Sequence, residues 1–231
     1  ESPLKIVRLN KEDASLEVLN KTINAKKVVL CTNGFENFSI DNNAGQDINT
    51  ELHHSVAGRI GYMAGYVQPL NHPPVAISYF SNTKDNSSDP TGDTYFYLTR
   101  RPHENEGEKD IDFNLICAGG PEKVLPNGAM YSRAHACDED VQEKINDFLL
   151  ANYGKHQRET EYAFCWHGLM GYTPSGVRRI GREPLNPVLM YNLGCNGVGI
   201  LPSIFGGKKI SRLLNNEVLE PSIFDPHDQG K

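Results

Sequence analysis

The glycine-rich stretch from Gly194 to Gly199 constrains the fold of this chain most, because of what lies on either side of it. Residues 187–193 (PVLMYNL) are β-rich, and apolar residues return at helical spacing after the glycines. The pattern predicts a strand, a tight turn and a helix. Glycine at such a turn permits positive φ angles and lets a ligand lie against backbone N–H groups. At the start of a helix those N–H groups favour negative charge.

A second buried strand is predicted at Val28 to Cys31. This apolar run follows two lysines and ends at Thr32-Asn33-Gly34. Continuous apolar character is typical of a strand covered on both faces, and in an open α/β sheet the C-terminal end of such a strand faces the ligand crevice. Upstream, residues 4–9 and 15–19 are β-type runs separated by NKED, which predicts a hairpin.

The middle of the chain predicts a separate sheet. Residues 35–55 are polar, and we interpret them as a long crossover loop. Strands are predicted at 56–70, 75–80, 95–99 and 113–117, in a mixed or antiparallel arrangement. Residues 138–153 predict a helix with Asp138 as its cap and Gly154 at its exit, and we assign this helix a structural role.

Composition excludes some classes of partner. A net charge of −6 and a pI near 5.8 argue against nucleic acid or an anionic membrane as the main partner. No apolar run approaches the ~20 residues of a membrane span. Five scattered cysteines indicate reduced thiols, as in a cytoplasmic protein. His53-His54 and His135-x-Cys137 lack further ligands at matching spacing, so no metal site is expected.

A combination of short motifs between Phe164 and Leu214 resembles a known family signature. The motifs are Trp166-x-Gly168, Thr173-Pro174-x-Gly176, Ile180-Gly181, the strand, Gly197-x-Gly199, and Gly206-Gly207. Together they resemble the C-terminal signature of the flavin-dependent amine and amino-acid oxidases of the D-amino-acid oxidase (DAO) superfamily. The sequence departs from that signature at Ser175, where the family has Asp, and at Arg178, where it has Pro.

The resemblance implies the fold and the cofactor. We expect an α/β (α+β) protein containing a remnant of a Rossmann-type FAD-binding domain and a mixed or antiparallel-sheet substrate domain. Residues 1–50 and 164–231 would belong to the FAD-binding domain, and 51–163 to the substrate domain. The residues expected to hold FAD are Thr32, Asn33, Gly34, Gly168, Asn196, Gly197, Val198, Gly199, Ile200 and Leu201.

One expected part of a Rossmann domain is missing from the sequence. Such a domain begins with a strand, G-x-G-x-x-G and an acidic residue about 20 positions later. None of these occurs here. We therefore expect a fragment, a split gene product, or a subunit whose partner supplies the N-terminal FAD-binding half. The chain by itself would then bind FAD weakly or not at all and would be inactive.

The expected activity is oxidation of a C–N bond by hydride transfer to flavin N5. Amino-acid oxidases of the family commonly carry Arg two residues after the Gly of W-x-G, where this chain has Met170. The missing carboxylate clamp favours an amine, polyamine or N-methyl compound over a simple D-amino acid. No catalytic acid or base is assigned. Expected substrate contacts are His167, Met170 and Tyr97, and the aromatic side chains that could form a wall of the active site are Tyr66, Tyr79, Tyr95 and Tyr97.

Several alternatives stay open at this point. His167 is equally well interpreted as a structural histidine. Arg178 and Arg179 are predicted to be a solvated pair, with a replacement carboxylate clamp as the alternative. The whole chain could instead be a non-catalytic interaction subunit that retains the substrate-domain fold without the cofactor. It could also be a nucleotide-binding domain of another α/β family with a similar signature.

Overall fold

The computed structural model describes residues 3–33, 38–48, 56–69, 72–80, 95–104, 113–126, 131–154 and 162–226. The chain divides into two compact units. Unit 1 contains Glu1–Gly58 and Met170–Lys231, and unit 2 contains Arg59–Leu169. Unit 2 is therefore an insertion into the sequence of unit 1. The architecture is mixed α+β, as predicted.

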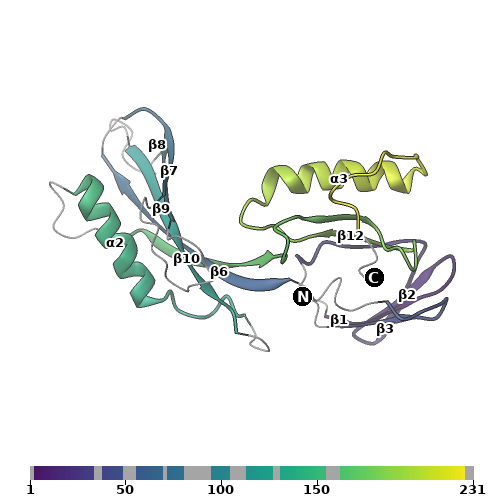
Figure 1. Cartoon of the computed structure of the whole chain (residues 1–231). Coiled ribbons are helices and arrows are strands. Elements are labelled where there is room, and N and C mark those ends of the chain that lie inside the picture. The colour runs from purple at the N-terminus through teal and green to yellow at the C-terminus, as the bar shows by residue number, and fades with distance from the viewer. Residues whose placement is uncertain are drawn as a thin grey trace. The chain divides into compact units, whose positions relative to one another are not determined.

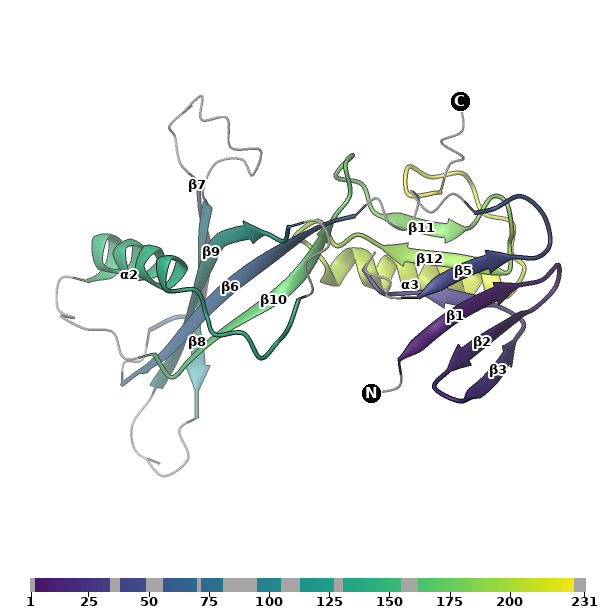
Figure 2. The ribbon, with the colours of Figure 1, turned by 90° about the horizontal axis from the view of Figure 1, so that it is seen from below.

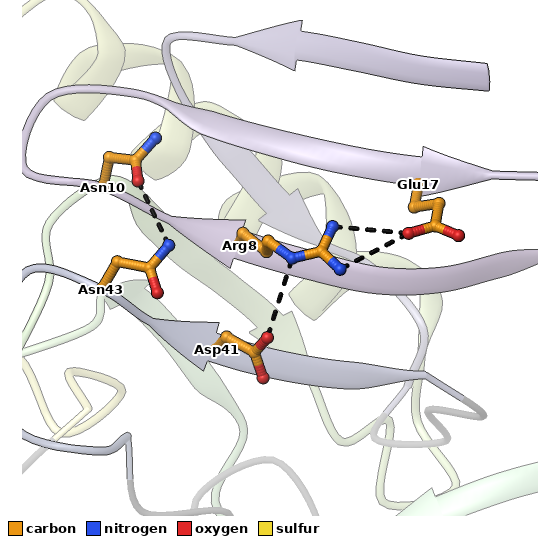
Figure 3. Close-up of polar contacts among 5 residues, drawn as sticks. All are labelled: Arg8, Asn10, Glu17, Asp41 and Asn43. Atoms are coloured by element: carbon orange, nitrogen blue, oxygen red, sulfur yellow. Dashed lines mark hydrogen bonds and ion pairs between the residues drawn. The ribbon is translucent and has the colours of Figure 1, made fainter.

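The first sheet of unit 1 has the strand order β3-β2-β1-β5. Strands β1 (Leu4–Leu9), β2 (Ala14–Val18) and β3 (Lys21–Ala25) are antiparallel neighbours, which confirms the predicted hairpin. On its surface, Arg8 lies between Glu17 at 3.4 Å and Asp41 at 3.9 Å (Figure 3). Asp41 belongs to β5 (Ser39–Asn42), which pairs parallel with β1. The prediction that residues 35–55 are entirely loop is therefore wrong for this strand.

The second sheet of unit 1 contains the two strands that the sequence singled out. Its order is β11-β12-β4, formed by Arg179–Arg182, Leu189–Leu193 and Val28–Leu30. β12 pairs parallel with β4, with Leu189 opposite Val28. The predicted strand before the glycine turn thus lies beside the predicted buried strand, although the two are about 160 residues apart in sequence.

Unit 1 is layered around this three-stranded sheet (Figure 1). One face packs against β1, with Val7 and Leu9 completely buried in the same core as the β4 and β12 side chains. The other face is covered by α3 (Ile200–Leu214), whose Ile210 packs with Ile180 and Met190. The predicted helix after the glycine turn is confirmed, and it begins at Ile200.

Unit 2 contains a five-stranded sheet in the order β10-β6-β9-β8-β7. The strands predicted from the sequence are present as β6 (Ala57–Gln68), β7 (Val75–Phe80), β8 (Tyr95–His103) and β9 (Phe113–Val124), and the pairs β6–β9, β9–β8 and β8–β7 are antiparallel. The fifth strand, β10 (Phe164–Tyr172), coincides with the start of the family motif and was not predicted as a strand.

One face of this sheet is covered by α2, residues Glu139–Tyr153 (Figure 2). Asp138 caps the helix by accepting a hydrogen bond from the N–H of Val141, and Gly154 ends it. Both details confirm the prediction. The apolar residues of α2 and of the strands form one core, which contains Tyr62, Ala64, Tyr66, Leu98, Ile116, Ala118, Val141, Ile145, Phe148 and Leu149. None of the helices in the described residues is both long and apolar enough to cross a membrane.

Candidate functional site

The turn between β12 and α3 uses backbone conformations that few residues adopt. Gly194 has φ +78° and Gly197 has φ +76°, and Asn196 between them has φ +49°. A Cβ on Gly197 would lie 2.5 Å from the hydroxyl oxygen of Tyr172. Glycine is therefore required at position 197 by both its φ angle and its close contact. The sequence predicted both the turn and the need for glycine in it.

Two asparagine side chains hold the turn in place. Asn33, which follows β4, accepts a hydrogen bond of 2.8 Å from the N–H of Cys195. Asn196 accepts one of 2.8 Å from the N–H of Thr173 and donates one of 3.2 Å to the carbonyl oxygen of Gly194. These bonds connect the turn to the ends of β4 and β10. Thr32 lies half-buried beside Asn33, whereas Gly34 lies outside the described residues.

The start of α3 is uncapped and uncovered by the part of the chain that the structure describes. Gly199 occupies the cap position without a side-chain hydrogen bond, and the first turn contains no acidic residue. The exposed fractions of Val198, Ile200 and Leu201 are 68%, 78% and 75%. These apolar side chains are highly exposed, and they lie beside backbone amides at the helix start that have no capping side chain. This combination indicates a place where a ligand or another protein segment packs.

Arg178 and Arg179 are buried, with exposed fractions of 7% and 9%. The prediction of a solvated pair is therefore wrong. Arg178 donates to Asn192 Oδ1 at 3.0 Å, to the carbonyl of Gly194 at 3.4 Å and to Ser203 Oγ at 2.9 Å. Burial lowers its pKa from the ordinary arginine value.

Arg178 thus binds the turn and α3 through neutral acceptors. No ion pair links it to a carboxylate of the described residues. The Nε atom of Arg179 has no hydrogen-bond partner among these residues either. A buried guanidinium without a carboxylate leaves net positive charge beneath the turn, in addition to the helix dipole. Nothing in the local sequence distinguishes this arrangement from a surface pair.

The four tyrosines proposed as a wall of the active site divide between the two faces of the unit 2 sheet. Tyr66 is buried in the core under α2, and the ring of Tyr79 packs edge-on against Phe148 of α2, at 4.9 Å between centroids. These two cannot form a wall of an active site on the face opposite α2. Tyr95 and Tyr97 occupy the alternate positions on β8, opposite to those of the core residues Phe96 and Leu98.

The face opposite α2 carries a polar cluster around Glu122. Tyr95 donates a hydrogen bond of 3.2 Å to Glu122 Oε1, and Arg59 lies 3.7 Å from the other carboxylate oxygen. Burial and the charge of Glu122 raise the pKa of Tyr95 to about 12, and they raise the pKa of Tyr97 as well. Both phenols are therefore neutral hydrogen-bonding groups at physiological pH. Tyr97 lies over Gly119, where a Cβ would be 2.4 Å from its hydroxyl oxygen.

His167 is surrounded by protein groups. Its Nδ1 lies 3.1 Å from the hydroxyl of Tyr131, and its Nε2 lies 2.9 Å from the carbonyl oxygen of His135. The rings of Tyr62 and Tyr131 flank it. These contacts favour the structural interpretation of His167 over a substrate contact. Gly168 follows it in β10 with Trp166 packed nearby, and Met170, farther along the strand, is half-buried in unit 1.

Comparison with solved structures identifies the class of fold. The chain is similar to glycine oxidase from Geobacillus kaustophilus (TM-score 0.57, 15% identity, 97% of this chain and 51% of that chain). It is also similar to NikD, described as an unusual amino acid oxidase essential for nikkomycin biosynthesis (TM-score 0.62, 13% identity, 97% and 54%). A third similar structure is amadoriase I from Aspergillus fumigatus, a fructosyl amine:oxygen oxidoreductase (TM-score 0.54, 15% identity, 96% and 48%). At these identities the likeness shows the fold, which is that of the DAO-type flavoenzymes.

The family model settles membership at the level of sequence. Residues 5–213 match the FAD dependent oxidoreductase family, DAO, so the chain belongs to this family. FAD is the cofactor of the family. The chain spans about half the length of the solved structures that it matches. No curated protein matches its sequence at a significant level.

Proposed function

We propose that this chain forms part of an FAD-dependent enzyme that oxidises a C–N bond in an amine or an amino-acid-like compound. The observation that carries this proposal is the start of α3. A glycine turn fixed by Asn33, Asn196 and Arg178 presents uncapped amides, and their apolar neighbours are exposed. Fixed donors of this kind suit a flat, electron-accepting ring that gains negative charge when it is reduced.

The residues of the turn fit the pyrimidine end of a flavin. The N–H groups of Ile200 and Leu201 have no side-chain cap. The N–H of Val198 donates to the carbonyl oxygen of Cys195 at 3.0 Å, and the hydroxyl of Tyr172 fills the place of a Cβ at Gly197, so both contacts fix the turn. We propose that the backbone of Asn196, Gly197, Val198, Gly199, Ile200 and Leu201 holds this end of the ring, with Thr32, Asn33, Gly34 and Gly168 as further contacts. When bound, FAD supplies the hydride acceptor for the reaction.

The protein contributes positive charge that is in place before the reaction begins. The amides of Ile200 and Leu201 lie at the positive end of α3, and the guanidinium of Arg178 lies beneath the turn, where its partners among the described residues are neutral. Groups that are already fixed need no reorganisation when charge develops, and this lowers the energy of the reduced state. Arg178 stands where the family signature has Pro, so this part of the arrangement belongs to this sequence.

Substrate selection is proposed for the face of the unit 2 sheet opposite α2 and for β10. Met170 occupies the position where related amino-acid oxidases place a carboxylate-binding Arg, which favours an amine over a simple amino acid. Tyr97 is the proposed substrate contact on β8, and the neutral phenol of Tyr95 lies beside it, 6.2 Å between ring centroids. Hydride abstraction depends mainly on alignment, so no acid–base pair is required from the side chains.

Amide NMR tests the cofactor proposal and detects even weak binding. Titration of the ¹⁵N-labelled chain with FAD should shift the amide signals of Val198, Gly199, Ile200 and Leu201. A valine at position 197 would collide with Tyr172 and displace the turn, so Gly197→Val should abolish these shifts. Gly207→Ala, on a part of α3 where a Cβ meets no atom within 4 Å, serves as the control and should leave them intact. Absence of shifts at these four amides, or their persistence in Gly197→Val, would contradict the proposal.

The exposed apolar start of α3 also favours one alternative, a non-catalytic interaction subunit without cofactor. Ile204 and Phe205 continue the apolar surface of Ile200 and Leu201, with exposed fractions of 65% and 46%. A surface of this kind can pack against another protein segment as well as against a ring. The same titration separates the two functions, because only the flavin proposal predicts shifts of the turn amides on addition of FAD.

A further inference from the structure

A cavity in unit 2 is lined by two cysteines. It has a volume of about 690 Å³ and lies between β10 and the segment 131–137 that precedes α2. Cys137 and Cys165 both line it, and both are half-buried free thiols. The proposed function uses neither of them.

The two thiols are brought near each other by the way the segment lies on β10. The hydroxyl of Tyr131 donates to the carbonyl oxygen of His167 at 3.0 Å, and Nε2 of His167 reaches the carbonyl oxygen of His135 at 2.9 Å. Cys165 lies two residues before His167 in the strand, on the same side of it. Cys137 lies two residues after His135. Because the segment 131–137 runs beside β10, Cys137 comes to lie near Cys165. The two thiols line the same cavity, close enough for Cys137 to influence the titration of Cys165.

Neighbouring groups fix this pair further. Gln142, in the first turns of α2, donates a hydrogen bond of 3.6 Å from Nε2 to the sulfur of Cys165. Cys137 directly precedes Asp138, the cap of α2. Cys137 is therefore held at the start of α2, and Cys165 is held within β10. No group of three or more His, Cys, Asp or Glu side chains in the described parts of the chain is arranged to hold a metal ion.

We propose that Cys137 and Cys165 are an oxidisable dithiol that closes to an intramolecular disulfide by exchange with a low-molecular-weight disulfide such as glutathione disulfide. One cysteine thiolate attacks the glutathione disulfide, forms a mixed disulfide and releases one glutathione thiolate. The second cysteine then attacks the protein sulfur of the mixed disulfide, forms the Cys137–Cys165 bond and releases the second glutathione. Two protein thiols are oxidised, one disulfide is reduced to two thiols, and the two protons pass to the glutathione thiolates.

The order of the two steps follows from the environment of Cys165. Burial, together with the neighbouring thiol of Cys137, raises the pKa of Cys165 to about 12. Because only the thiolate attacks, the first exchange should occur at Cys137. The mixed disulfide then lies directly beside Cys165, and this proximity favours ring closure over a second glutathione adduct.

The experiment is exchange with glutathione disulfide, followed by alkylation and peptide mapping. Trypsin places Cys137 in the peptide 134–144 and Cys165 in the peptide 159–178. The expected product is these two peptides joined by a disulfide, without glutathione. Trp166, the single tryptophan of the chain, lines the same cavity, so its emission should fall as the bond forms and recover with dithiothreitol.

Serine variants provide the controls. Cys137→Ser and Cys165→Ser should each abolish the joined peptide and the emission change, and Cys195→Ser, in unit 1, should abolish neither. Retention of native circular dichroism in each variant establishes that it is folded. Isolation of Cys137 and Cys165 as two separate glutathione adducts, or as two alkylated free thiols after prolonged exchange, would overturn the proposal. Joining of either cysteine to a different cysteine as the main product would overturn it as well.

Discussion

The side-chain oxygen of Asn33 accepts a 2.8 Å hydrogen bond from the backbone N–H of Cys195, 162 residues away in the sequence. The side-chain nitrogen of Asn33, Nδ2, donates a hydrogen bond of 3.4 Å to the sulfur of Cys195. Asn33 has φ +59°, a conformation that asparagine adopts more readily than most residues. One side chain thus connects the end of β4 to the glycine turn after β12.

Replacing Asn33 by alanine should destabilise unit 1. The change leaves the N–H of Cys195 without its partner and places alanine at a positive φ angle, for a combined loss of about 2–4 kcal/mol in the free energy of unfolding. Urea denaturation measures the loss. Asn216→Ala is the matched control, because Asn216 has φ +60° but lies at the exposed end of α3. An equal loss in both variants would show that the bond to Cys195 contributes nothing.

Three glycine-to-alanine variants separate strain from steric contact. Gly197→Ala combines φ +76° with a contact of 2.5 Å to Tyr172, whereas Gly176→Ala has φ +67° with no atom within 4 Å. We expect a loss of about 1–2 kcal/mol for Gly176→Ala and a larger loss for Gly197→Ala. Gly207→Ala, in a helix with open space, should stabilise the protein by about 0.5–1 kcal/mol. Thermal unfolding ranks the three, and a different order would refute the explanation.

Arg178→Lys should loosen the glycine turn although it keeps the charge. An ammonium group cannot reproduce the separate bonds of the guanidinium to Asn192, Gly194 and Ser203, so we expect a loss of about 1–3 kcal/mol in stability. Hydrogen exchange at the amides of residues 194–199 should accelerate. Arg212→Lys, at a half-exposed ion pair with Glu217, is the control and should change neither quantity measurably. Unaltered exchange in Arg178→Lys would contradict the bracing role.

Stability at acid pH should depend on Asp138. Its hydrogen bond to Lys123 holds the pKa of Asp138 below the ordinary aspartate value, with further support from the N–H of Val141. A carboxyl whose pKa is lowered by folding contributes stability above its unfolded pKa of about 3.9, and this contribution is lost as the pH falls through the folded pKa. Asp138→Asn keeps a good helix cap but removes the charge, so the free energy of unfolding should fall less steeply below about pH 4.

The control for this acid dependence is Asp140→Asn. Asp140 lies 3.7 Å from Lys123 as well, but its side chain is 81% exposed. Removing the charge of Asp140 should leave the decrease of the free energy of unfolding at acid pH nearly unchanged, because exposed ion pairs contribute little. Urea unfolding from pH 2 to pH 7 compares the two variants. Identical acid limbs in wild type and Asp138→Asn would show that the Asp138–Lys123 pair does not stabilise α2.

The parts of the fold that the sequence predicted are those with a local cause. β12, β4 and α3 have continuous or periodic apolar runs next to glycine or charge, and α2 has its own cap at Asp138. β5 was missed because SIDN contains a single apolar residue, and the strand exists only through its pairing with β1. β10 was missed for a similar reason, since its glycines and histidine suggest a motif more than a strand.

The candidate site divides in the same way. The positive φ angles of the turn follow from the glycines themselves, so their role could be predicted. The burial of Arg178 could not, because its acceptors come from β12 and α3, at Asn192 and Ser203. Tyr66 and Tyr79 lie on one face of the unit 2 sheet, and Tyr95 and Tyr97 lie on the other. Which pair is buried depends on the face that α2 covers. Alternation within each strand separates the two sets but does not say which set is covered.

The parallel pairing of β12 with β4 has a consequence for how the protein is made. Val28 leaves the ribosome long before Leu189 is synthesised, so β4 waits without its neighbour while all of unit 2 emerges. Closing a contact across so much chain is slow, and an apolar strand left open meanwhile is prone to wrong pairing. We therefore expect unit 2 to fold first during translation, and unit 1 to be the part that needs a chaperone.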